Sequence, residues 1–136
     1  MQKFDDGYLF TDEKDLVNLD TVFNLLKETY WAKDRSIEIV KKSIENSICF
    51  SILLSGRQIG FARAISDEST YTAILDLVID KDFRAMGLGK KLLEFIINNP
   101  KIKNTKKILW TKDSEKLYEK YGFSEDINMK VLFQKP

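Results

Sequence analysis

A long apolar segment, followed at once by glycines and then by an amphipathic pattern, limits most strongly what this chain can fold into. Residues 71–79 read YTAILDLVI, which is apolar almost throughout and is typical of a buried strand. Residues 84–90 then read RAMGLGK, and apolar residues recur at helical spacing at Leu88, Leu92, Phe95 and Ile96. The sequence therefore predicts a strand, a tight glycine loop and a helix that runs from Gly87 to Asn98.

The rest of the chain alternates strand and helix patterns. We expect strands at residues 8–11, at 48–66 as a hairpin, at 71–79, at 106–110 and at 128–134. We expect helices at 19–30, after an N-cap at Ser36, at 87–98 and at 113–121. The predicted order is β-α-α-β-β-β-α-β-α-β, an α/β (α+β) fold with helices packed on a largely antiparallel sheet. The length of 136 residues predicts one domain, residues 1–136.

Composition excludes several classes of function. The net charge of +1 gives no general attraction to nucleic acid. The chain has no histidine, which excludes Ser-His-Asp catalysis, Cys-His catalysis and histidine-ligated zinc, and no carboxylates have metal-ligand spacing. The lone Cys49 lies in a predicted strand and is expected to be a buried structural residue. Without a signal peptide or an apolar stretch of roughly 20 residues, a reduced cytoplasmic protein with no membrane contact is expected.

The loop RAMGLGK is physically suited to hold a pyrophosphate. A helix N-terminus presents unpaired N–H groups and a partial positive charge, and glycines let phosphate oxygens approach that backbone. Arg84 and Lys90 add positive charge on both sides. The alternative is an ordinary turn whose glycines only relieve backbone strain. The loop matches neither the Walker pattern GxxxxGK[ST] nor the Rossmann fingerprint, because the first glycine of the former and the third of the latter are missing.

The loop resembles the signature [Q/R]xxGx[G/A] of the GNAT superfamily of N-acetyltransferases, and LYEKYGF at 117–123 is similar to its LYxKxGF motif. YWAKDRS at 30–36 further resembles a group of small bacterial GNAT proteins. The resemblance covers essentially the whole chain. It implies a mixed, largely antiparallel central sheet with helices on both faces, acetyl-CoA as cosubstrate, no metal, and a monomer or a homodimer.

The resemblance also implies which residues contact acetyl-CoA. The loop would bind the pyrophosphate through backbone amides, and the strand before it would pair with the pantetheine arm. Superfamily members commonly carry Asn and Ala where this chain has Thr111 and Ser114, and the small-protein group often has His where Glu115 stands. Lys81 replaces a frequent proline. The predicted cofactor-binding residues are Leu77, Val78, Ile79, Arg84, Ala85, Met86, Gly87, Leu88, Gly89, Lys90, Thr111 and Ser114.

Two residues are the candidates for catalysis. The resemblance implies that Tyr118 lies near the thioester sulfur and protonates the departing thiolate. A free N–H group around Leu77 or Val78 could stabilise the oxyanion. The attacking amine must lose a proton, and we predict Asp76 as the general base, with a pKa raised by burial in an apolar strand. The alternative, equally weighted, is that Asp76 pairs structurally with Arg63 or Arg35, so that Glu28, Asp34 or water accepts the proton.

Three residues between the first two predicted helices are candidates for acceptor binding. In the superfamily this segment usually walls the acceptor pocket. Here it contains Tyr30, Trp31 and Arg35, two aromatic rings and a cation that could recognise a carboxylate-bearing or flat acceptor. The alternative is that the aromatic rings only cover the core and that Arg35 pairs with Asp34.

Three functions compete at this point. The first is an acetyl-CoA-dependent N-acetyltransferase that acts on a primary amine of a small molecule. The second is a non-catalytic acyl-CoA-binding or sensing domain, which would share the cofactor site but would not need Tyr118 or Asp76. The third is a nucleotide-binding module, which the missing Walker and Rossmann positions disfavour. The sequence does not identify the acceptor.

Overall fold

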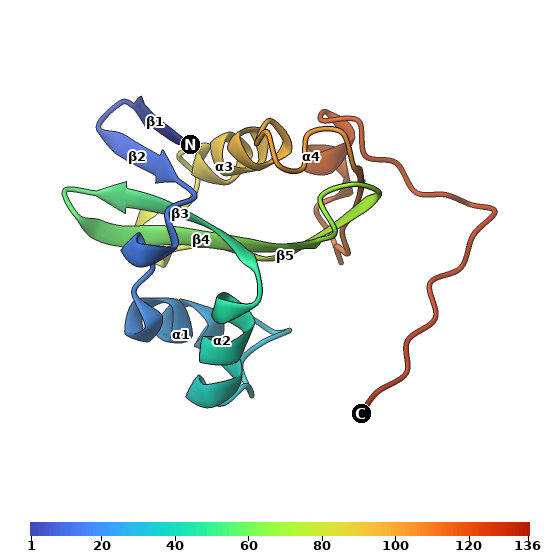
Figure 1. Cartoon of the computed structure of the whole chain (residues 1–136), viewed down its shortest axis with the longest axis horizontal. Coiled ribbons are helices and arrows are strands. Elements are labelled where there is room, and N and C mark those ends of the chain that lie inside the picture. Colours follow the sequence, from blue (N-terminus) through green and yellow to red (C-terminus); the bar gives the residue numbers. More distant parts are fainter.

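The computed structural model describes all residues from 1 to 136, and its centre is one twisted sheet of six strands (Figure 1). The strands are β1 (Gln2–Asp5), β2 (Tyr8–Thr11), β3 (Ile48–Leu54), β4 (Arg57–Ser66), β5 (Tyr71–Ile79) and β6 (Lys106–Ile108). They lie side by side in chain order; the pairs from β1 to β5 are antiparallel, and β5 and β6 are parallel. The predicted mixed, largely antiparallel sheet is confirmed.

Helices cover both faces of this sheet, as predicted (Figure 1). They are α1 (Leu19–Lys27), α2 (Ile37–Glu45), α3 (Leu88–Ile97) and α4 (Glu115–Glu119), with short 3-10 turns η1 (Lys14–Leu16) and η2 (Lys81–Phe83). The first two long helices lie on one face of the sheet, and α3 and α4 lie on the other. The order β-α-α-β-β-β-α-β-α therefore matches the prediction from β2 to α4.

Each face has its own apolar core, because side chains alternate between the faces along each strand. On one face, the apolar stripe of α3 packs with Phe10, Phe50 and Ile74 in a cluster of 13 buried residues. On the other, α1 and α2 pack with Phe61 and Val78 in a cluster of 9. The central strand β4 is buried on both faces over most of its length. The sheet is therefore held rigidly where its two faces are covered.

Local capping explains where two of the helices begin. The Asn18 side chain accepts a hydrogen bond from the Thr21 N–H at 3.0 Å and so caps α1. The Ser36 hydroxyl accepts one from the Ile39 N–H at 3.2 Å, which confirms the predicted N-cap of α2. The first helix ends at Lys27, earlier than the predicted residue 30. The connection between α1 and α2 is consequently longer than the sequence suggested.

The N-terminal hairpin is the element that the sequence reading missed. Strand β1 pairs with β2 through a tight turn in which Asp6 has φ 52° and Gly7 has φ 83°. Positive φ at both central residues is the type I′ geometry that an Asp-Gly pair favours in a two-residue hairpin. The dipeptide at 6–7 was therefore a usable signal for this strand.

The predicted closing strand at residues 128–134 is wrong: the chain there forms no strand (Figure 1). Ile127, Leu132 and Phe133 are exposed, and Phe133 packs its ring against Trp110, with centroids 5.8 Å apart, without strand pairing. Its prediction rested on β-branched and aromatic residues, but such residues form a strand only where another strand pairs with them. Strand β6 and helix α4 are also shorter than the predicted ranges 106–110 and 113–121.

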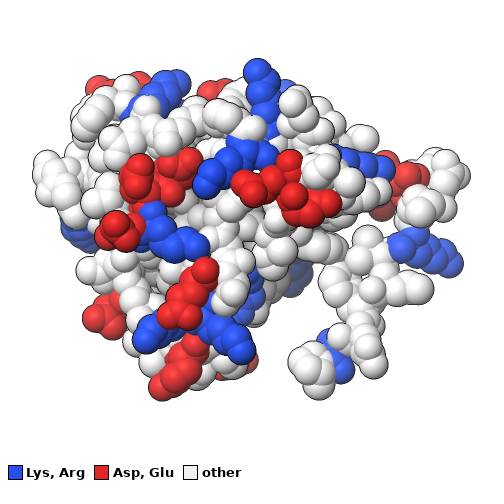
Figure 2. All heavy atoms as spheres, viewed as in Figure 1, with Lys and Arg blue, Asp and Glu red and all other residues white.

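Charges are mixed over the surface that Figure 2 shows, where basic and acidic side chains lie beside one another over the sheet edge and the helices. This distribution accords with the net charge of +1. None of the helices combines the length and the apolar character that crossing a bilayer requires.

Candidate active site

Strands β5 and β6 separate soon after they meet. Their parallel pairing covers only Tyr71–Ala73 against Lys106–Ile108. From Ile74 to Ile79, β5 pairs with β4 on one side and with no strand on the other. The structure therefore leaves a length of strand edge open, and this edge includes the predicted residues Leu77, Val78 and Ile79.

The glycine loop follows this open edge directly. After η2, Ala85 has φ 63° and Gly87 has φ 79°, so two left-handed residues turn the chain into α3. The N-cap of α3 is Gly87, which has no side chain to accept from the first-turn N–H groups. The first intrahelical bond runs from the Lys91 N–H to the Gly87 carbonyl at 3.2 Å. The N–H groups of the first turn are therefore available to an anion.

Different structural features explain the two glycines of the loop. A residue with a side chain would be strained at Gly87 because φ is positive there. The backbone of Gly89 is not left-handed, and a Cβ added there would meet only the Leu77 side chain, at 3.9 Å. Packing within the chain therefore does not explain Gly89. An open backbone at the start of a helix, next to a free strand edge, suits the close approach of a ligand.

Asp76 interrupts the ladder between β4 and β5. Its φ is 58°, a left-handed conformation that is uncommon for a residue with a side chain. The register with β4 shifts at this point, so that Asp76 and Leu77 face the single residue Ala62. This bulge breaks the regular alternation of the strand. It aims the Asp76 side chain at the face that α1 and α2 cover.

There the Asp76 carboxylate joins three side chains from two other elements. Its Oδ2 atom accepts from Arg35 Nη1 at 2.7 Å and from Arg63 Nε at 2.6 Å, and its Oδ1 atom accepts from Trp31 Nε1 at 2.9 Å. Arg63 also donates from Nη1 to the Ser47 hydroxyl at 3.2 Å. The structural pairing that the sequence left open for Asp76 is therefore present, with both arginines at once.

These contacts correct the predicted pKa of Asp76. Burial does raise the pKa of this carboxyl, but the hydrogen bonds and charges of Arg35 and Arg63 outweigh it and leave the pKa below its usual value. The prediction of a raised pKa rested on burial, and the alternative of pairing with Arg63 or Arg35 is the one that the structure shows. Asp76 is consequently held as a carboxylate whose oxygens are already hydrogen-bonded. Its role as a general base stays a prediction.

The connection between α1 and α2 meets the segment before α4. The rings of Tyr30 and Trp31 pack edge to face, with centroids 5.1 Å apart. The Lys112 ammonium lies 5.2 Å from the centroid of the Tyr30 ring. The predicted acceptor residue Tyr30 therefore contacts the segment that precedes α4, the helix that carries Tyr118.

Tyr118 is half-buried on α4. Its ring packs edge to face against Phe123, with centroids 6.0 Å apart, and also contacts the core below α3. Burial raises the pKa of the Tyr118 hydroxyl above the ordinary value of a tyrosine, so the hydroxyl carries its proton at neutral pH, as an ordinary tyrosine also does. Thr111 and Ser114 order the start of this helix, because the Ser114 N–H donates to the Thr111 hydroxyl at 3.0 Å.

Comparison with known proteins gives this arrangement a family. The model of the acetyltransferase (GNAT) domain matches residues 45–125, which is more than half of the chain. This match contains the bulge, the glycine loop and Tyr118. The chain belongs to the GNAT acetyltransferase family. It is therefore an acyltransferase, and the resemblance seen in the sequence is confirmed.

Relatives and solved structures agree with this assignment. An uncharacterized N-acetyltransferase, ycf52, from Pyropia yezoensis is 30% identical over 131 residues, covering 91% of this chain and 74% of its own. A protein of the same name from Gracilaria tenuistipitata is 34% identical, covering 81% of this chain and 64% of its own. A GNAT-family structure from Xanthomonas campestris superimposes with a TM-score of 0.86 and 27% identity, covering 93% of each chain. The GNAT fold is thereby shown.

Two groups of predicted residues lie in different parts of this GNAT fold. The predicted acceptor residues Tyr30, Trp31 and Arg35 lie with Asp76 on the face that α1 and α2 cover. The predicted cofactor residues follow the open edge of β5, the loop and the start of α3, and Thr111 and Ser114 lie before α4. Tyr118 lies on α4. The contact of Lys112 with the Tyr30 ring joins the two groups.

The sequence reading did not assign two polar features of this GNAT protein to the site. Arg63 was considered only as a structural partner, and Ser47, which it contacts, was not considered at all.

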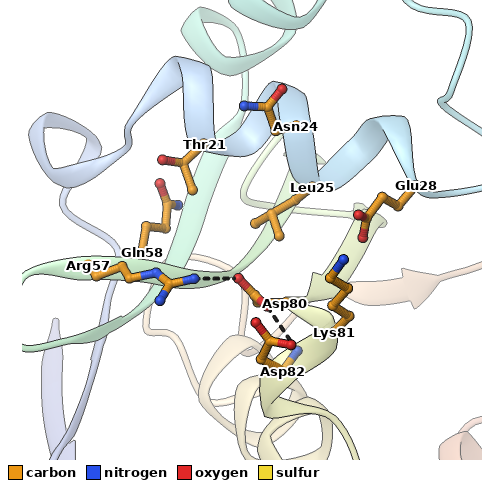
Figure 3. Close-up of a pocket in the computed structure, with 9 residues that line it drawn as sticks. All are labelled: Thr21, Asn24, Leu25, Glu28, Arg57, Gln58, Asp80, Lys81 and Asp82. Atoms are coloured by element: carbon orange, nitrogen blue, oxygen red, sulfur yellow. Dashed lines mark hydrogen bonds and ion pairs between the residues drawn. The ribbon is translucent and has the colours of Figure 1, made fainter.

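A pocket of about 320 Å³ between α1 and the ends of β4 and β5 was also not expected (Figure 3). It is lined by Thr21, Asn24, Leu25, Glu28, Arg57, Gln58, Asp80, Lys81 and Asp82. Neither Tyr118 nor Asp76 nor any residue predicted to bind acetyl-CoA lines it, whereas Glu28, the alternative proton acceptor, does.

Proposed function

We propose that this GNAT acetyltransferase transfers an acetyl group from acetyl-CoA to a primary amine of a small molecule by direct attack on the thioester. The observation that carries the proposal is the open edge of β5 that leads into a helix N-terminus with free N–H groups. An elongated ligand with an anionic end fits such an edge, because a free strand edge offers backbone pairing and a helix start offers anion binding.

The residues present fit acetyl-CoA. The pyrophosphate would be held by the first-turn N–H groups of α3, with Gly89 leaving the backbone uncovered. The Arg84 side chain is partly used within the protein, since its Nε donates to the Ile79 carbonyl at 3.0 Å. The pantetheine arm would pair along Leu77–Ile79. When bound, acetyl-CoA supplies an activated acyl group in the form of a thioester.

The protein's own groups would supply the proton transfers and the electrostatic stabilisation. Tyr118 would donate its proton to the leaving sulfur, since its hydroxyl is protonated at neutral pH. Free N–H groups at the bulge, around Leu77 or Val78, would donate to the carbonyl oxygen as its negative charge increases. The pKa of Asp76 is lowered and both of its oxygens are already hydrogen-bonded, which disfavours it as the proton acceptor and leaves Glu28, Asp34 or a water molecule that relays the proton as the alternatives.

The first experiment measures cofactor binding. Purified protein is titrated with acetyl-CoA in a calorimeter, with ATP and NAD as controls. We expect binding of acetyl-CoA and not of the two nucleotides. If acetyl-CoA does not bind, the loop is only a turn and the proposal is wrong.

The second experiment distinguishes an enzyme from a cofactor sensor. Free-thiol release is followed with acetyl-CoA and a panel of amines, using wild type and Tyr118→Phe. We expect Tyr118→Phe to lower kcat by about 100-fold or more while affinity for acetyl-CoA is kept, because general acid catalysis contributes factors of this size. Tyr121→Phe is the matched control, since Tyr121 is bonded to Glu94 on the surface. Equal rates for Tyr118→Phe and wild type would exclude Tyr118 as the acid.

A further inference from the structure

The cluster around Asp76 carries one more positive charge than negative. Two guanidinium groups, Arg35 and Arg63, share one carboxylate oxygen at 2.7 and 2.6 Å. The carboxylate is almost fully buried, and its other oxygen is bonded to the neutral Trp31 indole. A cluster of this composition keeps a net charge of +1 in a partly desolvated place, where charge interactions are stronger than in water.

The two arginines are used differently. The side chain of Arg63 is 10% exposed and is bonded at both ends, to Asp76 and to Ser47. The side chain of Arg35 is 27% exposed, and Asp76 is its one protein partner. A guanidinium has five N–H donors, so Arg35 keeps several without a protein partner. Asp76 therefore holds one end of the Arg35 guanidinium, and Arg63 holds Asp76 in turn.

Arg35 shares the Asp76 carboxylate with Trp31, a residue of the predicted acceptor wall. Trp31, which donates to the same carboxylate, packs against Tyr30, and both rings are exposed. The acidic residues of the same connection do not pair with Arg35. The Glu28 Oε2 atom lies 4.0 Å from Arg84 Nη2, and Asp34 is exposed and forms no ion pair. The ammonium group of Lys112, which lies against the Tyr30 ring, adds a further positive charge beside this wall.

We propose that the amine acceptor carries a carboxylate, as amino acids do, and that Arg35 binds this carboxylate beside Tyr30 and Trp31. This inference rests on the proposed acetyltransferase function and adds a substrate class to it. Arginine binds a carboxylate through two parallel N–H donors, and a guanidinium already fixed by Asp76 loses little freedom when it does so. Asp76 and Arg63 act as positioning residues for Arg35. The two rings supply a flat, amphipathic wall for the remainder of the acceptor.

The test compares acceptors that differ only in the carboxylate. Rates of thiol release are measured for γ-aminobutyric acid against 4-aminobutanamide, and for a panel of amino acids against their carboxamides. We expect kcat/KM to be at least about tenfold higher for the acids, because a charge-assisted pair is lost in the amides. Equal or better turnover of the amides, or of polyamines, would overturn the inference while leaving the acetyltransferase function intact.

Variants assign the effect to one side chain. We expect Arg35→Gln to raise KM for the acids by about tenfold or more, to change kcat less, and to leave the amides unaffected. Lys33→Gln removes an exposed cation from the same connection and should change nothing. If Arg35→Gln does not fold, the comparison of acids with amides on wild-type protein still tests whether the acceptor carries a carboxylate.

A binding measurement separates this inference from the proposed function. The N-acetyl derivatives of the amino acids and of their amides are titrated into wild type and Arg35→Gln by calorimetry. Binding of the acids that needs Arg35, without turnover of any amine, would support the carboxylate site and contradict the acetyltransferase function. Binding of neither set, together with no preference in turnover, would overturn the inference.

Discussion

Asp76 combines an unusual backbone with a fully used side chain. Its left-handed φ of 58° forms the bulge, and its carboxylate binds two arginines and a tryptophan. Such strain persists only where the surroundings hold it in place, as the three hydrogen bonds do here. The position therefore links the shape of the open strand edge to the acceptor wall.

Replacing Asp76 by Asn should remove the negative charge of the side chain while keeping the left-handed backbone of the bulge. Asn tolerates the left-handed conformation, but it leaves two guanidinium groups facing each other without an anion. We expect a loss of about 3 kcal/mol in the free energy of unfolding, the usual result of breaking a buried ion pair. Urea denaturation measures this loss, with the exposed Asp34→Asn as control. A variant as stable as wild type would show that the arginines find another partner.

The same variant tests the predicted base. If Asp76 positions Arg35, Asp76→Asn should raise the KM of the acceptor and keep the shape of the pH–rate profile. A profile that loses its acidic limb would instead identify Asp76 as the proton acceptor.

At the scale of elements, the glycine loop offers a clean pair of variants. Gly89→Ala should fold at least as well as wild type and still bind acetyl-CoA, because the added methyl has room and Ala favours helix. Gly89→Leu also suits a helix, but its larger side chain should cover the first-turn N–H groups. We expect it to weaken acetyl-CoA binding about tenfold or more in calorimetry, since charged hydrogen bonds are lost. Equal affinities for both variants would exclude an anion at this helix start.

The C-terminal segment gives a second prediction at this scale. Residues 127–133 pair with no strand, and their large apolar side chains are exposed. Their amide hydrogens should therefore exchange with solvent at nearly unprotected rates, while those of β4 stay protected. Strong protection in this segment would show that the strand expected from the sequence does form.

The sequence predicted correctly those elements that depend on interactions between residues close together in the chain. The helices, the hairpin at 48–66 and β5 follow from periodicity, caps and turns, all of which act over a few residues. The closing strand failed because strand formation needs a partner that local pattern does not specify. The residues assigned to the site stay predictions, and the raised pKa predicted for Asp76 is wrong, because Arg35 and Arg63 are distant in sequence and both meet Asp76 only in the fold.

At the scale of the molecule, acid should unfold the protein partly through Asp76. Its pKa is lowered in the folded state, so the unfolded state binds more protons near the ordinary value of about 3.9. The stability that it contributes is present above this value and is lost as the pH falls through the folded pKa. We expect the urea midpoint of wild type to drop below about pH 4 and that of Asp76→Asn to drop less. Parallel curves would show that other carboxyl groups dominate.

The short β5–β6 ladder affects how easily β6 can separate from β5. Three residue pairs join β6 to the sheet, whereas β4 and β5 pair along most of their length. Local opening costs less free energy where fewer hydrogen bonds and contacts break. The β5–β6 pairing is therefore expected to open at a lower free-energy cost than the β4–β5 pairing. Separation of β6 from β5 would lengthen the open edge of β5 without breaking the β4–β5 ladder.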